Sequence, residues 1–327
     1  MAKCIQFSHT GGPEVLDVVD RAPVEPGDGD VRISNRAIGL NFIDIYVRTG
    51  LYPVPGMPSG LGTEGAGVVD AVGSGVSGIR VGDRVAYAQG PLGAYGESHT
   101  LPAEKVVKLP DSIDFETAAA VMLKGLTVQY LLRQTFPLRG GETILFHAAA
   151  GGVGSIACQW ARALGVKLIG TVSSPEKAAL AMKNGAWATI DYTRENVPER
   201  VRELTAGAMV PVVYDSVGKD TWITSLDCLQ KRGLMVSFGN ASGPVENVNI
   251  GILNQKGSLF VTRPSLNGYA DTRERFEAMC RDLFSMLESG QVEVPIGQRF
   301  PLAKAGDAQA ALASRQTTGS TVLIPDF

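Results

Sequence analysis

The chain has 327 residues, more than one hydrophobic core usually supports, so we expect two domains. Hydrophobic residues make up 44% and charged residues 19%, a composition typical of a folded soluble protein that excludes a disordered chain. Thirty basic against thirty-three acidic side chains leave a net charge of −3, so no overall positive field exists to concentrate nucleic acid.

The beginning of the chain carries no recognisable export signal. Residues 1–7 include a charge and polar groups where a signal peptide has an apolar segment. The cysteines lie too far apart for a disulfide framework or a Cys-x-x-Cys metal site, at positions 4, 158, 228 and 280. We therefore expect a cytoplasmic protein. The uncharged run 143–161 contains His147 and three glycines, so we interpret it as strand, turn and helix, not as a membrane span.

The N-terminal part of the chain, residues 1–124, is dense in glycine and proline. Its short β-type runs include 31–38, 67–72 and 84–87, and turn signals separate them. We expect this part to form a mainly β domain.

Strand-like and helix-like patterns alternate in residues 125–265, which predicts a parallel sheet of an α/β domain. Ile156, Trp160 and Leu164 recur every four residues on one helix that Gly165 ends. Ser174 and Pro175 suit the cap and the first position of the next helix, and Gly185 suits its end. Six strands, the number of a complete doubly wound dinucleotide-binding domain, are predicted at 143–148, 167–172, 188–191, 210–215, 234–238 and 259–261.

The last part of the chain contains a helical pattern and a short β-like tail. Apolar residues at 276, 279, 283, 286 and 287 predict one helix face, and Gly290 suits the end of that helix. The tail 320–324 is too small for a core of its own, so we expect it to pack on the N-terminal β part. The first domain would then combine residues 1–124 and 266–327.

A glycine-rich turn joins the strand 143–148 to its helix with the sequence Ala149-Ala150-Gly151-Gly152-Val153-Gly154. Gly151 lets the backbone approach a pyrophosphate, Gly154 lets helix and strand pack closely, and the helix N-terminus offers N–H groups to the anion. Ala149 replaces the usual first glycine. The strand before and the helix after the turn favour a dinucleotide site over a turn without a ligand.

The end of the second strand favours NADP over NAD. NAD-binding folds place an acidic residue there to hold the ribose hydroxyls, whereas this chain has the small, neutral Ser173. Lys177, one helical turn further on, can bind a 2′-phosphate, although a lysine beside Glu176 can instead be simply solvated. Tyr192, after the third strand, either packs on the adenine or caps a core.

Two later strands should also present residues to the ligand, because open α/β sheets bind at the carboxyl ends of their strands. These ends are 214–218 and 237–240. Their glycines suit a close approach to the nicotinamide ribose, or they form plain strand-to-helix turns.

A series of short motifs extends along the whole chain: Gly11-Gly12-Pro13-Glu14-Val15-Leu16, Asn41-Phe42-Ile43-Asp44, Arg48-Thr49-Gly50-Leu51-Tyr52-Pro53, Gly62-Thr63-Glu64, Gly82-Asp83-Arg84-Val85, Leu123-Lys124-Gly125-Leu126-Thr127, Tyr214-Asp215-Ser216-Val217-Gly218 and Asn254-Gln255-Lys256-Gly257-Ser258-Leu259. With these motifs the chain resembles the medium-chain dehydrogenase/reductase superfamily, and within it the zeta-crystallin-like NADPH:quinone oxidoreductases. The resemblance implies a GroES-like mainly β domain and, at 125–265, a Rossmann domain.

The resemblance also implies that no metal is needed. At the positions where zinc alcohol dehydrogenases of the superfamily carry their ligands, this chain has Asn41, Thr63 and Lys124. Catalytic zinc needs three imidazole, thiolate or carboxylate ligands, which these residues do not supply. The three histidines, at 9, 99 and 147, are separated along the chain, and we expect packing or surface roles for them.

By position, the resemblance implies two sets of site residues. The catalytic set is Asn41, Asp44, Tyr46 and Tyr52. The set that binds NADP(H) is Asn41, Phe42, Ile43, Tyr46, Thr63, Tyr130, Gly151, Gly152, Val153, Gly154, Ser173, Lys177, Tyr192, Ser216, Phe238, Gly239, Asn240, Arg263, Pro264, Ser265 and Arg315.

The implied reaction is the reduction of a quinone, a small-molecule substrate, by NADPH. Little acid catalysis is required, and orientation of the reactants carries most of the rate. Asn41 and Tyr46 either hydrogen-bond the developing oxyanion or only hold cofactor and loop. The alternatives are an enone or alkenal reductase, and an RNA-binding or structural crystallin-like protein; the acidic balance argues against RNA. The resemblance further implies a homodimer joined through the strand 259–261.

Overall fold

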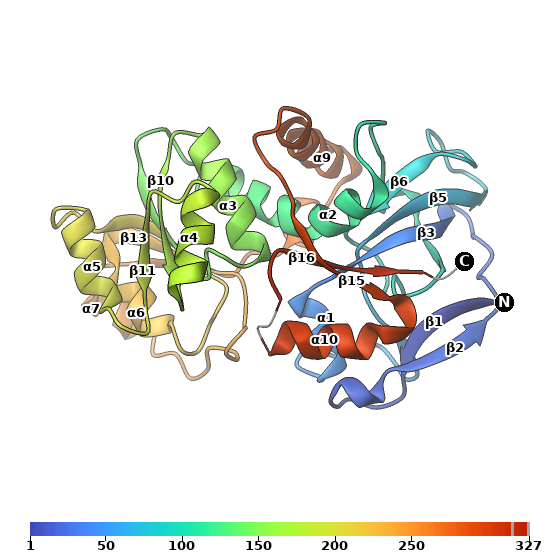
Figure 1. Cartoon of the computed structure of the whole chain (residues 1–327), viewed down its shortest axis with the longest axis horizontal. Coiled ribbons are helices and arrows are strands. Elements are labelled where there is room, and N and C mark those ends of the chain that lie inside the picture. The colour runs from blue at the N-terminus through green and yellow to red at the C-terminus, as the bar shows by residue number, and fades with distance from the viewer. Residues whose placement is uncertain (315–316, 326–327) are drawn as a thin grey trace. The chain divides into compact units, whose positions relative to one another are not determined.

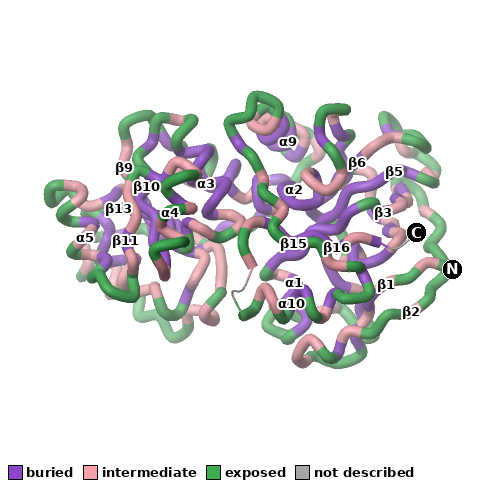
Figure 2. Tube along the Cα trace, in the orientation of Figure 1, coloured by how far each residue is buried: buried purple, intermediate pink, exposed green. Residues whose placement is uncertain are grey.

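The computed structural model describes residues 1–314 and 317–325, which form two units. Unit 2 consists of Thr127–Tyr269 and Ser289–Glu293, and unit 1 contains Met1–Leu126, Ala270–Glu288 and the described residues from Val294 on. Figure 2 shows that the central strands of each unit are buried and that exposed residues gather in the loops. The domain boundaries at 124/125 and 265/266 stay predictions.

Unit 2 contains a parallel sheet of six strands in the order β11-β10-β9-β12-β13-β14. Val, Ile and Leu dominate these strands because both faces of the sheet are covered. The order, with the first strand in the middle, confirms the predicted doubly wound sheet. The strands are β9 (Thr143–Phe146), β10 (Lys167–Val172), β11 (Ala188–Asp191), β12 (Val210–Asp215), β13 (Leu229–Ser237) and β14 (Phe260–Thr262).

Three of these strands differ from the prediction at their ends. β9 ends at Phe146, before Ala148, whose left-handed conformation (φ +56°) starts the turn. β13 begins at Leu229 because it pairs with β12 on both sides of an irregularity that contains Arg232 (φ +62°) and shifts the register. β14 begins and ends one residue later than the predicted 259–261.

Helices cover both faces of this sheet. Leu145 and Ile169 pack with α5 and α6 in one apolar cluster, and the alternate residue Leu168 is equally buried on the other face. Figure 1 shows α3 and α4 side by side along the sheet. The helices of unit 2 are α3 (Gly152–Ala163), α4 (Pro175–Lys183), α5 (Val197–Leu204), α6 (Trp222–Asp227), α7 (Gly251–Gln255) and α8 (Leu266–Tyr269), with a π-turn at Leu131–Thr135.

The predicted helix ends of unit 2 are confirmed. The side chain of Ser174 accepts the N–H of Lys177 at 3.3 Å, and Pro175 is the first helical residue of α4. Gly165 (φ +70°) and Gly185 (φ +103°) follow α3 and α4 in the left-handed conformation that favours glycine.

Unit 1 is built around two sheets. The larger one has the order β15-β16-β3-β5-β6-β8, with β7 also paired to β3, and the smaller one has the order β2-β1-β4. The strands are β1 (Ala2–Phe7), β2 (Asp17–Arg21), β3 (Asp30–Leu40), β4 (Ser59–Gly60), β5 (Gly65–Val72), β6 (Arg84–Tyr87), β7 (Ser98–Pro102), β8 (Val106–Lys108), β15 (Ile296–Pro301) and β16 (Ser320–Ile324). The mainly β character predicted for this part is confirmed.

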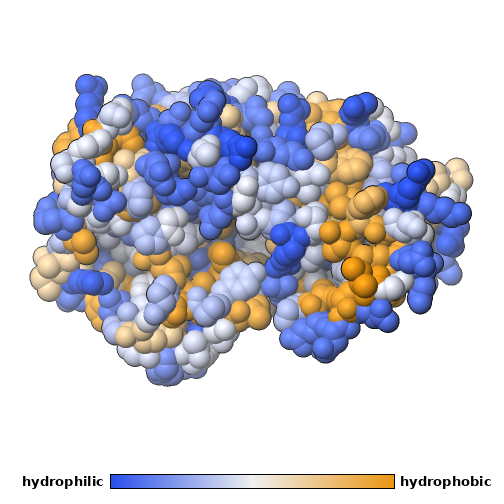
Figure 3. Space-filling view, turned by 180° about the vertical axis from the view of Figure 1, so that it is seen from behind, coloured by the Kyte–Doolittle hydropathy of each residue, from blue (hydrophilic) through white to orange (hydrophobic). Residues whose placement is uncertain are grey.

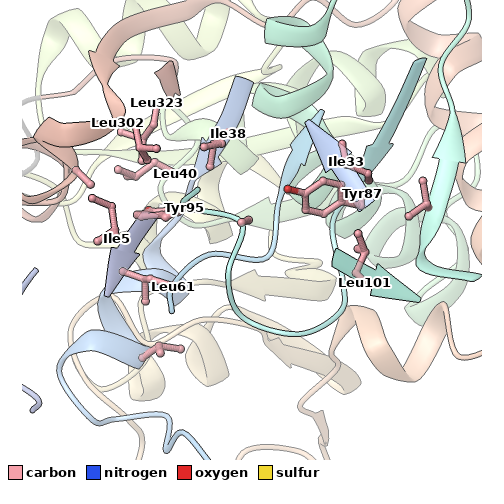
Figure 4. Packing of buried hydrophobic residues seen from close by; sticks show 14 of the residues in the cluster. Ile5, Ile33, Ile38, Leu40, Leu61, Tyr87, Tyr95, Leu101, Leu302 and Leu323 are labelled. Carbon is pink, nitrogen blue, oxygen red and sulfur yellow. The ribbon is translucent and has the colours of Figure 1, made fainter. Parts of the chain in front are cut away.

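The C-terminal tail completes this unit, as predicted. β16 pairs antiparallel with β3, and Figure 4 shows Leu323 and Leu302 beside Leu40 in the buried cluster. The predicted late helix is α9 (Arg273–Glu288), which buries Phe276 and Leu283. The other helices of unit 1 are α1 (Phe42–Arg48), α2 (Phe115–Tyr130, which continues into unit 2) and α10 (Ala305–Ala313), with 3-10 turns at Pro13–Val15, Ala103–Lys105 and Leu302–Lys304.

Candidate functional site

The glycine-rich turn of unit 2 leads directly from β9 into α3. Gly151 is the N-cap of α3, so no side chain occupies the helix N-terminus, and the first turn contains no acidic residue. A Cβ at Gly154 would lie 2.3 Å from the Ala148 carbonyl oxygen and 2.6 Å from Ala149 Cα. Helix and turn therefore approach each other at a distance that only glycine permits. The start of a helix is a general site for anions, because its first N–H groups have no partner within the helix.

Alanine replaces the usual first glycine of this turn without strain. Ala149 is buried, and a Cβ at Gly170 on the neighbouring strand β10 would lie 2.4 Å from the Ala149 Cβ. The glycine at position 170 therefore makes room for the methyl group at position 149.

A buried hydrogen-bond network holds the turns after β9 and β12 together. Asp215 accepts hydrogen bonds from the N–H groups of Val217 and Gly218 at 2.7 and 3.0 Å and from the hydroxyl of Ser225 at 2.7 Å. His147 Nε2 lies 3.0 Å from the Ser225 hydroxyl. The Ser225 hydroxyl donates its hydrogen bond to Asp215, so it can only accept a hydrogen bond from His147. Nε2 of His147 therefore carries the ring proton, and Nδ1 accepts a hydrogen bond from Thr171. Burial lowers the pKa of His147, which favours this neutral form.

The ends of β12 and β13 lie side by side. Asp215 pairs in register with Ser237, and a Cβ at Gly239 would lie 2.3 Å from the Ser216 carbonyl oxygen. The guanidinium of Arg263 donates hydrogen bonds to the Ser237 and Gly239 carbonyl oxygens at 3.2 and 2.9 Å. Arg263 thus fixes the segment after β13 at the same edge of the sheet as the glycine-rich turn.

Ser173, the residue directly after β10, contacts Lys177 of α4. The Lys177 ammonium donates to the Ser173 hydroxyl at 3.1 Å, so the positive charge lies at the carboxyl end of the strand. The backbone N–H of Tyr192 donates to the Val172 carbonyl oxygen at 3.1 Å, which holds the residue after β11 at the same edge. The Tyr192 side chain is 47% exposed, so it caps no core. A cation and a hydroxyl therefore contact each other at this edge of the sheet, where the backbone of Tyr192 is also held.

In unit 1, Asn41 is the N-cap of α1 and is buried. Its backbone N–H donates to Asp44 Oδ2 at 2.8 Å, and the hydroxyl of Tyr95 donates to the same oxygen at 2.9 Å. Asp44 is 1% exposed, and burial raises its pKa to about 7. The carboxyl group thus holds the start of α1 in place.

A second buried carboxyl group holds the side chain of Asn41. The Asn41 amide nitrogen donates to Glu64 Oε2 at 2.6 Å, and the Lys124 ammonium lies 3.8 Å from the same oxygen. Lys124 also donates to the Leu40 carbonyl oxygen at 3.4 Å. Burial raises the pKa of Glu64, and the positive charge of Lys124 opposes this shift.

Aromatic side chains surround the exposed side of α1. The rings of Phe42 and Tyr46 are 6.3 Å apart, and those of Tyr46 and Tyr52 are 5.4 Å apart, edge to face. Phe42 is 36% exposed, while Tyr46 and Tyr52 are half-buried. This trio, beside the polar group of Asn41, offers a surface suited to a flat aromatic or quinonoid molecule.

The remaining predicted site residues are spread over both units. In unit 1, Ile43 and Thr63 are half-buried. In unit 2, Tyr130 is 3% exposed and stacks on Tyr269, with ring centroids 4.7 Å apart and planes at 9°. Gly152, Val153, Phe238 and Asn240 are half-buried, Pro264 is buried and Ser265 is exposed. Arg315 lies outside the described residues.

Across residues 1–314 and 317–325, no three His, Cys, Asp or Glu side chains gather as a group that could hold a metal ion. His9 is exposed, whereas His99 and His147 are buried. These positions agree with the surface and packing roles expected for the three histidines. In that same part of the chain, no helix has the length and hydropathy to cross a bilayer.

Sequence reasoning missed the most deeply buried polar side chain near Asn41. Glu64 is fully buried, although it was noted only as part of the motif Gly62-Thr63-Glu64. A glutamate that directly precedes the small, apolar strand β5 is the signal that could have identified it, because a lone carboxyl group in such a run requires partners.

Comparison with known proteins gives matches over the whole chain. The profile of the alcohol dehydrogenase GroES-like domain matches residues 27–111, and that of zinc-binding dehydrogenases matches residues 152–285. A quinone oxidoreductase of Pseudomonas aeruginosa is 70% identical and covers 99% of this chain and 100% of its own.

Two crystal structures match with a TM-score of 0.98, and each covers 99% of this chain and 100% of its own. One is a quinone oxidoreductase of Pseudomonas syringae pv. tomato DC3000, at 63% identity. The other is the Escherichia coli quinone oxidoreductase complexed with NADPH, at 57% identity.

Proposed function

Because the chain belongs to the quinone oxidoreductases of the medium-chain dehydrogenase/reductase superfamily, we propose that it is an NADPH-dependent quinone reductase that works without zinc. The observation that carries the choice of cofactor is the contact of Lys177 with Ser173 at the end of β10, where NAD-binding sheets carry an acid. The matched E. coli structure, complexed with NADPH, supports the same choice.

We propose that the edge of the unit 2 sheet binds NADPH. The pyrophosphate binds to the N-terminal N–H groups of α3, which the close approach of Gly154 holds open. The 2′-phosphate binds to Lys177 and Ser173, and the exposed ring of Tyr192 packs on the adenine. The bound cofactor supplies the reducing equivalents. The residues proposed to bind it are those predicted from the resemblance, with Arg315 outside the described part.

On unit 1, we propose that the aromatic trio and Asn41 bind the quinone. A quinone accepts a hydride readily, since the product is an aromatic hydroquinone anion whose charge is delocalised. The side chains therefore need only orient the ring and donate hydrogen bonds to its oxygen, which suits Asn41 and Tyr46. Asp44 holds Asn41 by accepting its backbone N–H at the N-cap, and the ring of Tyr52 packs against the ring of Tyr46.

The donor set of unit 1 does not fit zinc, although one matched profile is that of zinc-binding dehydrogenases. Asn41 uses its amide N–H on Glu64, and the Lys124 ammonium brings a positive charge within 3.8 Å of the same carboxylate. A metal cation at this position would be repelled by Lys124 and would find one carboxylate ligand where three ligands are needed.

An acceptor screen tests the proposed function. With NADPH as donor, quinones should be reduced with a higher kcat/KM than enones and alkenals assayed in parallel. A preference for the enones would move the assignment to the rival reductase, and no turnover of either class would remove the enzymatic proposal.

Replacing Lys177 with alanine should weaken NADPH binding by about 1–3 kcal/mol, the range for a charge-assisted hydrogen bond, and leave NADH binding nearly unchanged. Titration calorimetry with both cofactors measures this difference. Lys183→Ala, which removes the same charge from the exposed end of α4, is the control and should change neither affinity. Equal weakening of NADPH and NADH would contradict the 2′-phosphate role.

Exhaustive chelation should leave the quinone reductase activity intact. Elemental analysis of the treated protein should then find no stoichiometric metal. Zinc independence would be wrong if chelation removed activity and added zinc restored it.

We also propose a homodimer joined through β14, the edge strand of the unit 2 sheet. Phe260 and Val261 are 61% and 39% exposed, so Phe260 does not face its own helices. An edge strand with exposed apolar side chains is an aggregation hazard unless it is paired. Figure 3 shows that apolar residues also gather on the visible face of unit 2.

Light scattering at low micromolar concentration should give twice the chain mass of 34.5 kDa, and Phe260→Lys should lower it. Val18→Lys, at an exposed position of β2 in unit 1, is the matched control. A monomer mass for the unmodified protein would exclude the stable dimer.

A cytoplasmic location completes the proposal. All four cysteines are free thiols, and those at 158, 228 and 280 are buried, which suits a reducing compartment. Cell fractionation would test it, with recovery of the protein outside the cytoplasm as the contrary result.

A further inference from the structure

We propose that Glu64 is a positioning residue for the reaction: with Lys124 as its counter-ion, it holds the Asn41 amide in a single orientation. This inference rests on the proposed quinone reductase function, in which Asn41 donates to the quinone oxygen. All the groups concerned lie in unit 1.

The first argument is the number of donors around Glu64. Its Oε1 accepts the backbone N–H of Leu123 on α2 at 2.6 Å, and its Oε2 accepts the Asn41 amide at 2.6 Å. The Lys124 ammonium lies 3.8 Å from Oε2. The Leu123 N–H and the Asn41 amide donate to its two oxygens, and the nearby ammonium adds a positive charge, so a protonated Glu64 would point its own O–H at one of these donors. These contacts therefore favour the ionised form of Glu64 against the effect of its burial.

The second argument is the space that the fold reserves for this carboxylate. A Cβ at Gly39 on β3 would lie 2.1 Å from Glu64 Oε2 and 2.3 Å from the Ala119 carbonyl oxygen. Glycine at this position lets the carboxylate enter between β3 and α2. An apolar residue at position 64 would not need the space that Gly39 leaves for a carboxylate. A buried ion pair is in itself only weak evidence for a gain in stability. The arrangement thus serves orientation better than it serves stability.

The consequence for Asn41 is that both its backbone and its side chain are fixed by carboxyl groups. Asp44 accepts the backbone N–H, and Glu64 accepts one amide N–H. An amide group is planar, so one short hydrogen bond also fixes the direction of its second N–H and of its carbonyl oxygen. Glu64 therefore determines which atom of Asn41 is presented to a ligand.

Substitution of Glu64 by glutamine should reverse this presentation. A glutamine at position 64 has one oxygen and one NH2 group in place of two carboxylate oxygens. In either orientation of the side-chain amide, its NH2 group would face a hydrogen-bond donor, the Leu123 N–H or the Asn41 amide. The Asn41 amide would then rotate to bring its oxygen to the new NH2 group. The N–H that orients the quinone oxygen would be withdrawn.

The test is a double-mutant cycle of Glu64→Gln and Asn41→Ala on quinone kcat/KM. Glu64→Gln alone should lower kcat/KM about 10- to 100-fold, the scale of a misplaced orienting group. In the Asn41→Ala background the same change should have an effect within about two-fold, because the residue through which it acts is gone. Losses that simply add would overturn the proposal.

A readout without turnover follows the Asn41 amide directly. In nitrogen-15 NMR spectra of the full chain, one Asn41 side-chain amide proton should be shifted downfield by its bond to the carboxylate, and Glu64→Gln should remove that shift. Glu116→Gln, which changes a surface ion pair with Arg299 in the same unit, is the control and should leave the signal and the activity unchanged. An unchanged signal in Glu64→Gln would overturn the proposal.

A further variant covers the case in which Glu64→Gln fails to fold because Lys124 is left as an unpaired buried charge. The double variant Glu64→Gln with Lys124→Met removes both charges and keeps similar side-chain volumes. It should fold and should show the same loss of kcat/KM and of the amide signal. Full activity in this folded variant would overturn the proposal. If the unmodified protein reduced no quinone, the proposed function would fail, and the amide signal would still test the positioning.

Discussion

Replacing Gly154 with alanine is expected to weaken NADPH binding by about 3 kcal/mol, the upper part of the range for an overpacked site. The added methyl group would lie 2.3 Å from the Ala148 carbonyl oxygen and 2.6 Å from Ala149 Cα. Both atoms belong to the backbone, which has no side chain that can rotate away. The N-terminus of α3 would have to move out from the turn, and the N–H groups proposed to bind the pyrophosphate would move with it.

Titration of the variant with NADPH, followed by fluorescence, measures this loss. Gly27→Ala is the control, because a Cβ there would meet only the Asp30 carboxylate at 3.5 Å. Circular dichroism of both variants would show whether the sheet of unit 2 remains folded. An NADPH affinity of Gly154→Ala within a few-fold of the unmodified protein would contradict the role of this close approach.

Replacing Asp44 with asparagine is expected to stabilise the protein at pH 8 by about 4 kcal/mol and by much less at pH 5. Burial raises the pKa of Asp44 to about 7, whereas an aspartate in the unfolded chain has a pKa of about 3.9. At a pH between these two pKa values, Asp44 is ionised in the unfolded chain and still protonated in the folded protein. Stability therefore falls as pH rises, by about 1.4 kcal/mol per pH unit, and becomes constant above pH 7.

Asparagine at this position has no proton to lose and retains the hydrogen bonds. Both donors, the Asn41 N–H and the Tyr95 hydroxyl, bind the same oxygen of Asp44, so one amide oxygen can accept both. Urea denaturation of the two proteins at pH 5, 6, 7 and 8 measures the difference in free energy of unfolding. A difference that stays constant over this range would show that Asp44 titrates normally.

The fold of unit 2 could be predicted from local patterns. The runs 167–172, 188–191 and 210–215 are strands with those bounds, because branched apolar residues and flanking turn residues act within a few positions of each other. The helix start at Ser174 and Pro175 is equally local. The ends of β9 and β13 were less predictable, since left-handed residues such as Ala148 leave no clear trace in the sequence.

The chemistry of unit 1 was much less predictable from the residues alone. Asn41 is 23 residues from Glu64 along the chain, and Lys124 is farther still. No spacing rule for helices or strands joins such positions; they meet only through the pairing of β3 with β5 and the packing of α2. For that reason the resemblance to a known family indicated Asn41, whereas the partners of its side chain became visible only in the structure.

The pairing of β16 with β3 has a consequence for how the protein is made. Ribosomes extend the chain from its N-terminus, and domains generally fold as units during synthesis. The sheet of unit 2 has all its strands once residue 262 has been added, whereas the large sheet of unit 1 lacks its β15 and β16 until residues 296–324 follow. During that interval the end of β3 at residues 38–40 lacks the partner strand β16, whereas β7 already pairs with residues 30–34. The nascent chain should therefore carry the complete parallel sheet of unit 2 while the large sheet of unit 1 is still incomplete and accessible to chaperones.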